Sequence, residues 1–276
     1  MVEGTYRKTH TTTNMKVSII MSVYNGGQKI KESIESILNQ TFSDFEFLII
    51  DDASNDETAS VLREYGARDP RIIITTNDTN IGLTKSLNKG INKASGVYIA
   101  RMDVGDTSEP ERFAQQVVFL DSHPEYGLVG SWTHVIDERS KKIGEMKYPT
   151  GNDVLKQGLI KHNLFVHSSV MMRKSALDAV GLYDERWKYA QDYELFLRLA
   201  AHTNIANLPL YLASYRISPD SITKRKNKAQ VMFAIHARVA AIKRGQYSLL
   251  SYIHLIAPFI GYLLPYNFKQ WFKKII

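Results

Sequence analysis

Residues 98–106 read Tyr98-Ile99-Ala100-Arg101-Met102-Asp103-Val104-Gly105-Asp106, a short apolar run that ends in an acidic turn. Because a Ser-Gly pair precedes the run, this pattern predicts a short buried strand bounded by turns. In an open α/β sheet, ligands bind beyond the carboxyl ends of the strands. Asp103 and Asp106 follow that end, where they could hold a divalent ion or accept hydrogen bonds from a ribose. An ordinary acidic turn explains the same residues, so the choice between a turn and a ligand site depends on the residues that end the neighbouring strands.

Three more strands are predicted upstream. Val17–Val23 and Phe45–Ile50 are almost continuously apolar, as expected for strands buried on both faces of a parallel sheet, and Ile72–Thr75 is a third. Helical spacing of apolar residues predicts helices between them, one opened by a capping box of Ser54 and Glu57. The alternation predicts a doubly wound, mostly parallel α/β sheet with helices on both faces.

The alternation becomes less regular after residue 110. We expect a helix after Pro110, strands at 128–133, 167–172 and 210–216, and a helix that opens at Gln191-Asp192-Tyr193. The expected organisation is one domain over residues 15–223. Its regular half covers about 15–110 and its less regular half about 111–223.

Composition and motifs exclude several classes of protein. The 276 residues contain no Cys, so disulfides and thiolate metal sites are excluded. No Gly-x-Gly-x-x-Gly follows the first strand and no Walker-type loop occurs, which argues against dinucleotide oxidoreductases and P-loop NTPases. Carboxylates after the second strand (Asp51-Asp52) and the fourth (Asp103) instead favour a nucleoside ligand at one sheet edge.

The two ends of the chain differ from its body. Residues 1–14 form a polar, Thr-rich leader without the apolar segment of a secretory signal, so we expect disorder there and a cytoplasmic location. From residue 221 onward there are ten Lys or Arg and no Asp or Glu. Since the whole chain carries +7, the preceding 220 residues carry −3. The basic character therefore concerns what residues 224–276 contact.

Those last residues combine cations with apolar side chains. Leu249–Leu264 is apolar but shorter than the ~20 residues that a spanning helix needs, and Pro258 interrupts it. Farther on, one helical face collects Phe268, Trp271, Phe272, Ile275 and Ile276. We expect a basic amphipathic helical tail that binds the anionic inner face of the cell membrane. The alternative is a helix folded back on the body, and nucleic acid is a poorer fit.

Several blocks, in order, resemble the family 2 glycosyltransferases, which are inverting enzymes of the GT-A fold. The resemblance covers roughly Val17–Thr223 and implies a nucleotide half at about 15–110 and an acceptor half at about 111–223. The blocks are Val17–Asn25, Gln40–Glu46 with Asp51–Ser54, Asn80–Gly90, Ala100–Asp103 with Pro110–Phe113, His167–Arg173, Gly181–Glu185, Gln191–Leu195 and Tyr215-Arg216.

The resemblance implies roles for single residues. Ser22, Tyr24 and Asp52 match positions that hold the uracil and ribose of a UDP-sugar. Asp103 matches the first carboxylate of the family's Asp-x-Asp motif. Asp192 matches the carboxylate that removes the proton from the acceptor hydroxyl.

Two departures from the family concern the metal. The second carboxylate of Asp-x-Asp falls on Gly105, which leaves Asp106 one position late. Many relatives also carry a His after the Arg matched by Arg216, where Ile217-Ser218 stands here. We expect one divalent cation, Mg²⁺ or Mn²⁺, held by Asp103 and Asp106 together with the donor diphosphate.

Structural explanations compete at several of these positions. Asp192 could be only the N-cap of its helix, and the helix dipole would then lower its basicity. Arg101 and Arg216 could neutralise a diphosphate or be salt-bridged scaffold residues. His167 could hydrogen-bond locally or line the acceptor site.

The resemblance implies an inverting hexosyl- or N-acetylhexosaminyltransferase. It would move a sugar from a UDP-sugar to a hydroxyl of a lipid-linked glycan in surface polysaccharide, O-antigen or capsule synthesis. The alternative is a catalytically impaired member that binds a nucleotide sugar or glycan as a membrane-docked partner, as Gly105 and Ser218 suggest. Nucleotidyl transfer is disfavoured because the first loop lacks a Gly-rich run with Arg and Lys.

Overall fold

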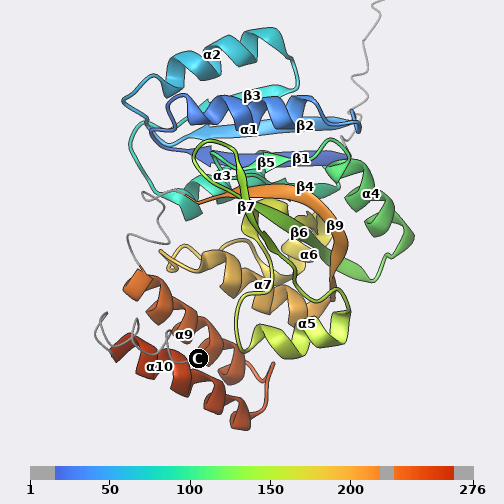
Figure 1. Cartoon of the computed structure of the whole chain (residues 1–276), viewed down its shortest axis with the longest axis vertical. Helices are drawn as coiled ribbons and strands as arrows, with labels where there is room; N and C mark the ends of the chain where they lie inside the picture. Colours follow the sequence, from blue (N-terminus) through green and yellow to red (C-terminus); the bar gives the residue numbers. More distant parts are fainter. Residues whose placement is uncertain (1–15, 218–226, 264–276) are drawn as a thin grey trace, which may run out of the picture.

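The computed structural model describes residues 16–217 and 227–263 (Figure 1). The predicted leader and the aromatic face at residues 268–276 lie outside these ranges. The described strands are β1 (Val17–Val23), β2 (Phe45–Asp51), β3 (Ile72–Thr76), β4 (Tyr98–Arg101), β5 (Thr107–Ser108), β6 (Tyr126–Ile136), β7 (Lys142–Met146), β8 (Met171–Arg173) and β9 (Asn204–Arg216). The described helices are α1 (Lys29–Leu38), α2 (Thr58–Arg68), α3 (Leu83–Lys93), α4 (Arg112–Ser122), α5 (Asn152–Leu159), α6 (Lys174–Val180), α7 (Gln191–His202), α9 (Asn227–Lys243), α10 (Ile253–Leu263) and the 3₁₀ helices η1 (His167–Ser169) and η2 (Leu249–Tyr252).

One sheet runs through the whole body. The order is β3-β2-β1-β4-β8-β6-β9-β5, with β7 paired to β6. β3, β2, β1 and β4 are parallel, whereas β8 runs antiparallel to both β4 and β6. The chain leaves β1 towards β2 on one side and later returns to β4 on the other. The carboxyl ends of β1 and β4 are therefore the switch point at which such sheets bind ligands.

The strand sequences explain this sheet, because alternate side chains of β1 enter different cores. Val17, Ile19, Met21 and Val23 pack with α1, α2 and α4, whereas Ile20 packs on the other face with α3 and α7. β2 is buried at every position. Helices on both faces thus account for the continuous apolar runs, and the predicted α/β fold is confirmed.

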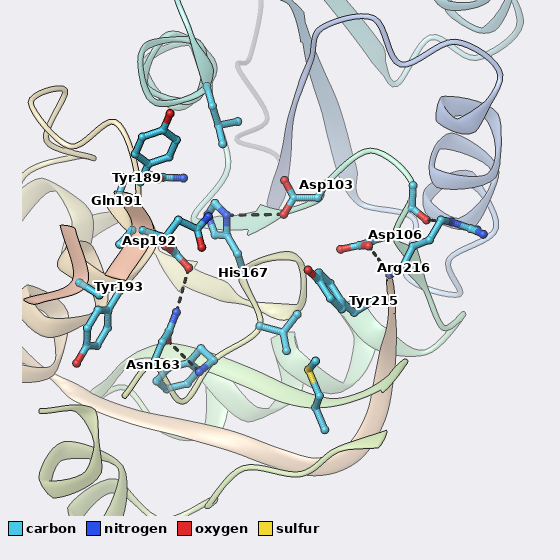
Figure 2. A pocket seen from close by; sticks show the side chains of 18 of the residues that line it. Asp103, Asp106, Asn163, His167, Tyr189, Gln191, Asp192, Tyr193, Tyr215 and Arg216 are labelled. Atoms are coloured by element: carbon cyan, nitrogen blue, oxygen red, sulfur yellow. Dashed lines mark hydrogen bonds and ion pairs between the residues drawn. The ribbon is translucent and has the colours of Figure 1, made fainter. Parts of the chain in front are cut away.

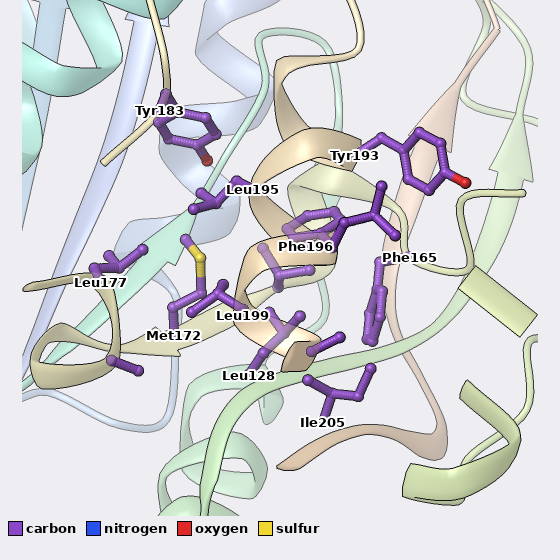
Figure 3. Close-up of a cluster of buried hydrophobic side chains, with 14 of the residues drawn as sticks. Leu128, Phe165, Met172, Leu177, Tyr183, Tyr193, Leu195, Phe196, Leu199 and Ile205 are labelled. Carbon is purple, nitrogen blue, oxygen red and sulfur yellow. The ribbon is translucent and has the colours of Figure 1, made fainter. Parts of the chain in front are cut away.

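The second core is centred on α7. Leu195, Phe196 and Leu199 of this helix are completely buried. Figure 3 shows them packed with the sheet residues Leu128 and Ile205 and with Phe165. The apolar face predicted for this helix is the face that anchors it, so the amino end of α7 is held in a fixed place.

A buried arginine joins the two halves of the sheet. Arg112, at the start of α4, has no exposed surface, and burial lowers the pKa of its guanidinium to about 9. Its Nη2 donates to the carbonyl oxygens of Arg101 (3.0 Å) and Val170 (3.1 Å), while Nη1 donates to Ser108 Oγ (2.9 Å). These bonds tie the end of β4 to the segment before β8.

The predicted capping box is wrong. Ser54 Oγ accepts a hydrogen bond from the backbone N–H of Asn25 instead (3.0 Å), which binds the loop after β1 to the loop after β2. Helix α2 begins later, at Thr58, whose N–H is bound by Asp56 Oδ1 (3.0 Å). The turn that follows β2 therefore uses the serine for a long-range contact rather than for the helix.

Part of the strand predicted at residues 167–172 is helical. His167–Ser169 form η1, and only Met171–Arg173 join the sheet as β8. The N–H and the hydroxyl of Ser169 both donate to the carbonyl oxygen of Val166, at 2.9 Å each, which closes the turn. Such local serine bonds compete with strand pairing.

The segment predicted as a tail begins with a helix that packs on the body. Ala237 and Ala241 of α9 are fully buried in the core around α7. Arg244 Nη1 lies 2.9 Å from Glu194 Oε1 of α7. α10 contacts α9 and lies farther from the sheet than α9 does (Figure 1). Among the described residues, no helix has the length and apolar character needed to cross a bilayer.

Candidate active site

A cavity of about 690 Å³ lies at the carboxyl end of β4, with the amino end of α7 as a second wall and α9 as a third. Its lining contains the carboxylates Asp103, Asp106 and Asp192. Figure 2 shows Asp192 on one side and Asp106 with Arg216 on the other, with Asp103 between them. The structure thus brings together the predicted base and both predicted metal ligands.

Asp103 is presented to the cavity by a buried arginine. Arg101 is 1% exposed; its Nη1 donates to the carbonyl oxygen of Ile20 (3.1 Å), and its Nη2 donates to Asp103 Oδ1. The side chain of Asp103 remains 34% exposed. The scaffold interpretation therefore describes Arg101, which reaches the site only through Asp103.

His167 lies beside the same carboxylate. Its Nδ1 is 3.7 Å from Asp103 Oδ2, and its Nε2 is 2.7 Å from Tyr183 Oη. Burial lowers the pKa of His167 to about 4, and the nearby Arg101 charge adds to this effect. The imidazole is consequently neutral at physiological pH, and it separates Asp103 from Asp192 in Figure 2.

Asp106 faces the protein more than the cavity. It is 4% exposed; Oδ1 accepts from the backbone N–H of Arg216 (2.8 Å) and Oδ2 from the Ser168 hydroxyl. Burial raises the pKa of Asp106 to about 7, and the neighbouring Asp103 charge raises it further. With both oxygens engaged, Asp106 has the contacts of a structural residue.

Arg216 closes the same corner of the structure. Its Nε donates to the Gly105 carbonyl oxygen (2.7 Å), Nη1 to that of Asp137 (2.9 Å), and Nη2 to Glu32. Three segments distant in sequence thus contact this one side chain. The scaffold interpretation therefore describes Arg216 as well.

The predicted nucleotide residues Ser22, Tyr24 and Asp52 lie at the switch point, outside the lining of the cavity that contains Asp103. Tyr24 is 51% exposed and directly follows Ser22 and Val23 at the end of β1. Asp52 is 2% exposed. Its Oδ1 accepts from Asn77 Nδ2 (2.8 Å) and the Ile81 N–H (2.9 Å), and its Oδ2 from the Gly82 N–H (2.8 Å). This carboxylate shapes the loop before α3.

Three non-glycine residues near these positions have left-handed backbones. Asn25 (φ 52°) and Ala53 (φ 62°) come directly after Tyr24 and Asp52, and Ala190 (φ 53°) precedes α7. Such conformations cost free energy and persist where surrounding contacts fix them, often at functional sites. Their places support a site formed by the ends of β1, β2 and α7.

Asp192 lies in the first turn of α7 and is not its cap. The N-cap is Ala190, and no side chain caps the helix. Asp192 Oδ2 instead accepts a hydrogen bond from Asn163 Nδ2 (3.0 Å), which orients the carboxylate in the cavity lining. The capping explanation is thereby removed, and an oriented carboxylate remains.

Residues 18–181 match the family model described as Glycosyl transferase family 2. The chain belongs to this family. It is 35% identical over 213 residues to the O-antigen biosynthesis glycosyltransferase WbnJ of Escherichia coli, an alignment that covers 75% of this chain and 82% of WbnJ.

Solved structures confirm the GT-A fold of this family 2 glycosyltransferase. The fragment 1–349 of Staphylococcus aureus TarS in complex with UDP-GlcNAc superposes with a TM-score of 0.65 at 18% identity, over 83% of this chain and 66% of the fragment. The mannosyltransferase PcManGT of Pyrobaculum calidifontis, in complex with GDP-Man and Mn²⁺, gives 0.64 at 17% identity, over 94% of this chain and 84% of PcManGT.

Sequence reasoning missed the wall that α9 contributes to the glycosyltransferase cavity. Gln230, Val231, Ala234 and Arg238 of this helix line it. The basic charge of the segment pointed to a surface, and no motif in α9 indicates the cavity. Asn163, the partner of Asp192, was also missed, since a lone Asn in a polar stretch carries no signal.

We predict that Asp106→Ala lowers the free energy of unfolding by about 1–3 kcal/mol, because it leaves the Arg216 N–H and the Ser168 hydroxyl without an acceptor. Asp106→Asn keeps an acceptor and should cost less. Because burial raises the folded-state pKa of Asp106, the wild type loses stability as pH rises from about 4 to 7. The cost of Asp106→Asn should therefore shrink over that range. Urea unfolding in EDTA measures both effects, with the exposed Asp153→Asn as control.

Proposed function

We propose that this protein is an inverting glycosyltransferase that moves a sugar from a UDP-sugar to a hydroxyl of a glycan acceptor. The observation that carries the proposal is the pair of accessible carboxylates, Asp103 and Asp192, which reach one cavity from β4 and from α7 (Figure 2). Asp103 suits the leaving diphosphate and its ion, and Asp192 suits the acceptor. The UDP-GlcNAc bound by the TarS fragment supports a nucleotide-sugar donor.

The proposed reaction is a single displacement. Asp192, oriented by Asn163, accepts the proton of the acceptor hydroxyl while that oxygen attacks the anomeric carbon. The new C–O bond forms on the face opposite UDP, and the bond between the anomeric carbon and the phosphate oxygen breaks. The proton ends on Asp192 and the electron pair leaves with UDP, so the anomeric configuration inverts.

The donor nucleotide is proposed to lie over the switch point. Tyr24 is exposed at the end of β1, where its ring can stack on uracil, and Ser22 lies beside it. Asp52 contributes through the loop at 77–82 that it holds. Oδ2 of Asp52 accepts a single hydrogen bond, so a contact with a base N–H would not have to displace one.

The residues present fit a divalent ion held by few protein ligands. Asp103 is accessible, whereas both oxygens of Asp106 accept hydrogen bonds, and among the described residues no group of three or more Asp, Glu, His or Cys side chains is placed to hold a metal ion by itself. Mg²⁺ and Mn²⁺ accept such sparse ligation because phosphate oxygens and water complete the shell. When bound, the ion would neutralise charge that builds up on the diphosphate. The Mn²⁺ in PcManGT supports this assignment.

The acceptor is proposed to be a lipid-linked glycan at the inner face of the cell membrane. The segment of η2 and α10 exposes a row of large apolar side chains: Leu249, Leu250, Ile253, Ile256, Phe259 and Ile260. The sequence after residue 220 contains ten cations, of which Arg238 is buried and Arg244 pairs with Glu194. The combination is typical of helices that lie in an anionic membrane surface. The O-antigen role of WbnJ supports a surface polysaccharide as product.

Asp192→Asn should reduce sugar transfer at least about a hundredfold, since the amide keeps the shape but cannot take the proton. UDP affinity should stay within about twofold of wild type. Donors are first selected by thermal shift, and UDP release is then measured with extracted glycolipids as acceptors. Asp184→Asn is the matched control, because Asp184 pairs with Arg186 outside the cavity. Transfer by Asp192→Asn at the wild-type rate would place the base elsewhere and contradict the proposal.

Metal and UDP should bind with positive coupling. We expect Mn²⁺ to tighten UDP binding to the wild type, Asp103→Ala to abolish that gain, and Asp106→Asn to keep it, because only Asp103 is accessible. Calorimetry of UDP binding with Mn²⁺ and with EDTA gives the comparison. Equal UDP affinities of the wild type in the two buffers would exclude the ion from donor binding.

Removal of residues 249–276 should release the protein from anionic vesicles and leave a folded body. The cut keeps Tyr247, whose hydroxyl donates to the Lys156 carbonyl oxygen (2.8 Å). Co-sedimentation with phosphatidylglycerol vesicles is compared with phosphatidylcholine vesicles, and the thermal midpoint checks folding. Membrane docking through this segment is wrong if the truncated and full chains bind equally, or if lipid charge makes no difference.

A further inference from the structure

Arg238 is a buried cation without a counter-charge. It is 6% exposed in α9; its Nε donates to Tyr193 Oη (3.0 Å), and its Nη1 is buried without any hydrogen-bond partner. In the described part of the chain, no carboxylate forms an ion pair with it. Buried charges are normally paired, because an unpaired one loses its hydration without compensation. The guanidinium therefore lacks an anion.

The position of Arg238 indicates where that anion comes from. It lines the same cavity as Asp192, and its partner Tyr193 is the next residue of α7. In Figure 2, Tyr193 and Asp192 lie at the opposite end of the cavity from Asp106 and Arg216. The end with Asp103 and Asp106 suits the donor diphosphate. Arg238 belongs to the end where the acceptor hydroxyl must lie.

A structural role accounts for only part of this side chain, whose Cζ lies 5.6 Å from the centroid of the Tyr193 ring. One N–H of five is used by Tyr193, whose hydroxyl is itself fixed by a bond to the Leu159 carbonyl oxygen. A neutral sugar hydroxyl could accept a hydrogen bond from Arg238 but would leave its charge uncompensated. A phosphate compensates the charge and matches the planar guanidinium with two parallel hydrogen bonds. Lys188, an exposed cation in the same lining, adds to the positive field.

We propose that the acceptor carries a phosphate group that Arg238 binds, close to the hydroxyl that Asp192 deprotonates. This inference rests on the proposed function of the cavity as the transfer site. The phosphate could belong to the diphosphate linkage of a short lipid-linked sugar or to a phosphate ester within the glycan. Both present the same chemistry to Arg238.

The test measures the binding of small probes to the full chain with its donor site saturated by UDP. Glucose 1-phosphate stands for a phosphate at the linkage, glucose 6-phosphate for an ester within the glycan, and methyl α-glucoside for a neutral sugar. Ligand-observed NMR gives the affinities. The wild type should bind one of the phosphates at least about tenfold more tightly than the neutral sugar, and the phosphate that binds better identifies the source.

Arg238→Gln should remove that preference and leave UDP affinity unchanged. Lys243→Gln is the matched control, because it removes the same charge from an exposed position of α9 outside the cavity. Its phosphate preference should equal that of the wild type. If Arg238→Gln does not fold, Arg238→Lys replaces it; loss of the paired hydrogen bonds should then weaken the phosphate severalfold, and an unchanged affinity would refute the proposal.

Other outcomes overturn the inference in distinct ways. A wild type without phosphate preference, or an Arg238→Gln variant that retains it, shows that Arg238 does not bind the acceptor. Weaker UDP binding by Arg238→Gln would assign the residue to the donor. A wild type that binds no nucleotide would refute the proposed function itself, and this result is read from the UDP titration alone, before any sugar is added.

Discussion

The site depends on the contact between Asp106 and Arg216. Asp106 accepts hydrogen bonds from the backbone N–H of Arg216 and from the hydroxyl of Ser168. The side chain of Arg216 donates hydrogen bonds to Gly105, Asp137 and Glu32. The loop after β4, the end of β9, η1, the turn after β6 and helix α1 thus meet at one corner. Burial of Asp106 and Arg216 costs free energy. Their hydrogen bonds offset this cost only if all these segments are in place together. These contacts hold the loop after β4 on which Asp103 lies, and Arg101 orients the Asp103 side chain.

The backbone conformation of Gly105 explains why the expected second carboxylate is missing. Gly105 has φ +92°, a conformation that side chains disfavour, and a Cβ there would lie 3.7 Å from Arg216 Cδ. The positive φ therefore favours glycine at this position, where Arg216 Nε donates to the carbonyl oxygen of Gly105. Asp106, one residue later, accepts hydrogen bonds from the Arg216 N–H and the Ser168 hydroxyl. Asp103 is therefore the accessible acid of the motif.

The sequence predicted well what depends on apolar periodicity and on dense motifs. The strands at 17–23 and 45–50, the helix with Leu195 and Phe196 on its buried face, and the joint appearance of Asp103 and Asp192 in one cavity all follow from such patterns. The roles of polar side chains were less predictable, because they depend on partners far apart in sequence. Ser54 bonds to Asn25 rather than capping α2, and Asp106 bonds to Arg216 across 110 positions.

Helix α9 shows why charge alone did not reveal that this segment forms a wall of the cavity. Its cations are of two kinds that look identical in the sequence: Lys243 is exposed, whereas Arg238 is buried against Tyr193 in the cavity wall. Because α9 packs on α7 and leads directly into η2 and α10, the exposed apolar row is fixed relative to Asp192. A surface that settles on that row would therefore also set the direction from which an acceptor enters the cavity. The two proposals, that Arg238 recognises the acceptor and that the apolar row docks on a membrane, thus involve the same helix.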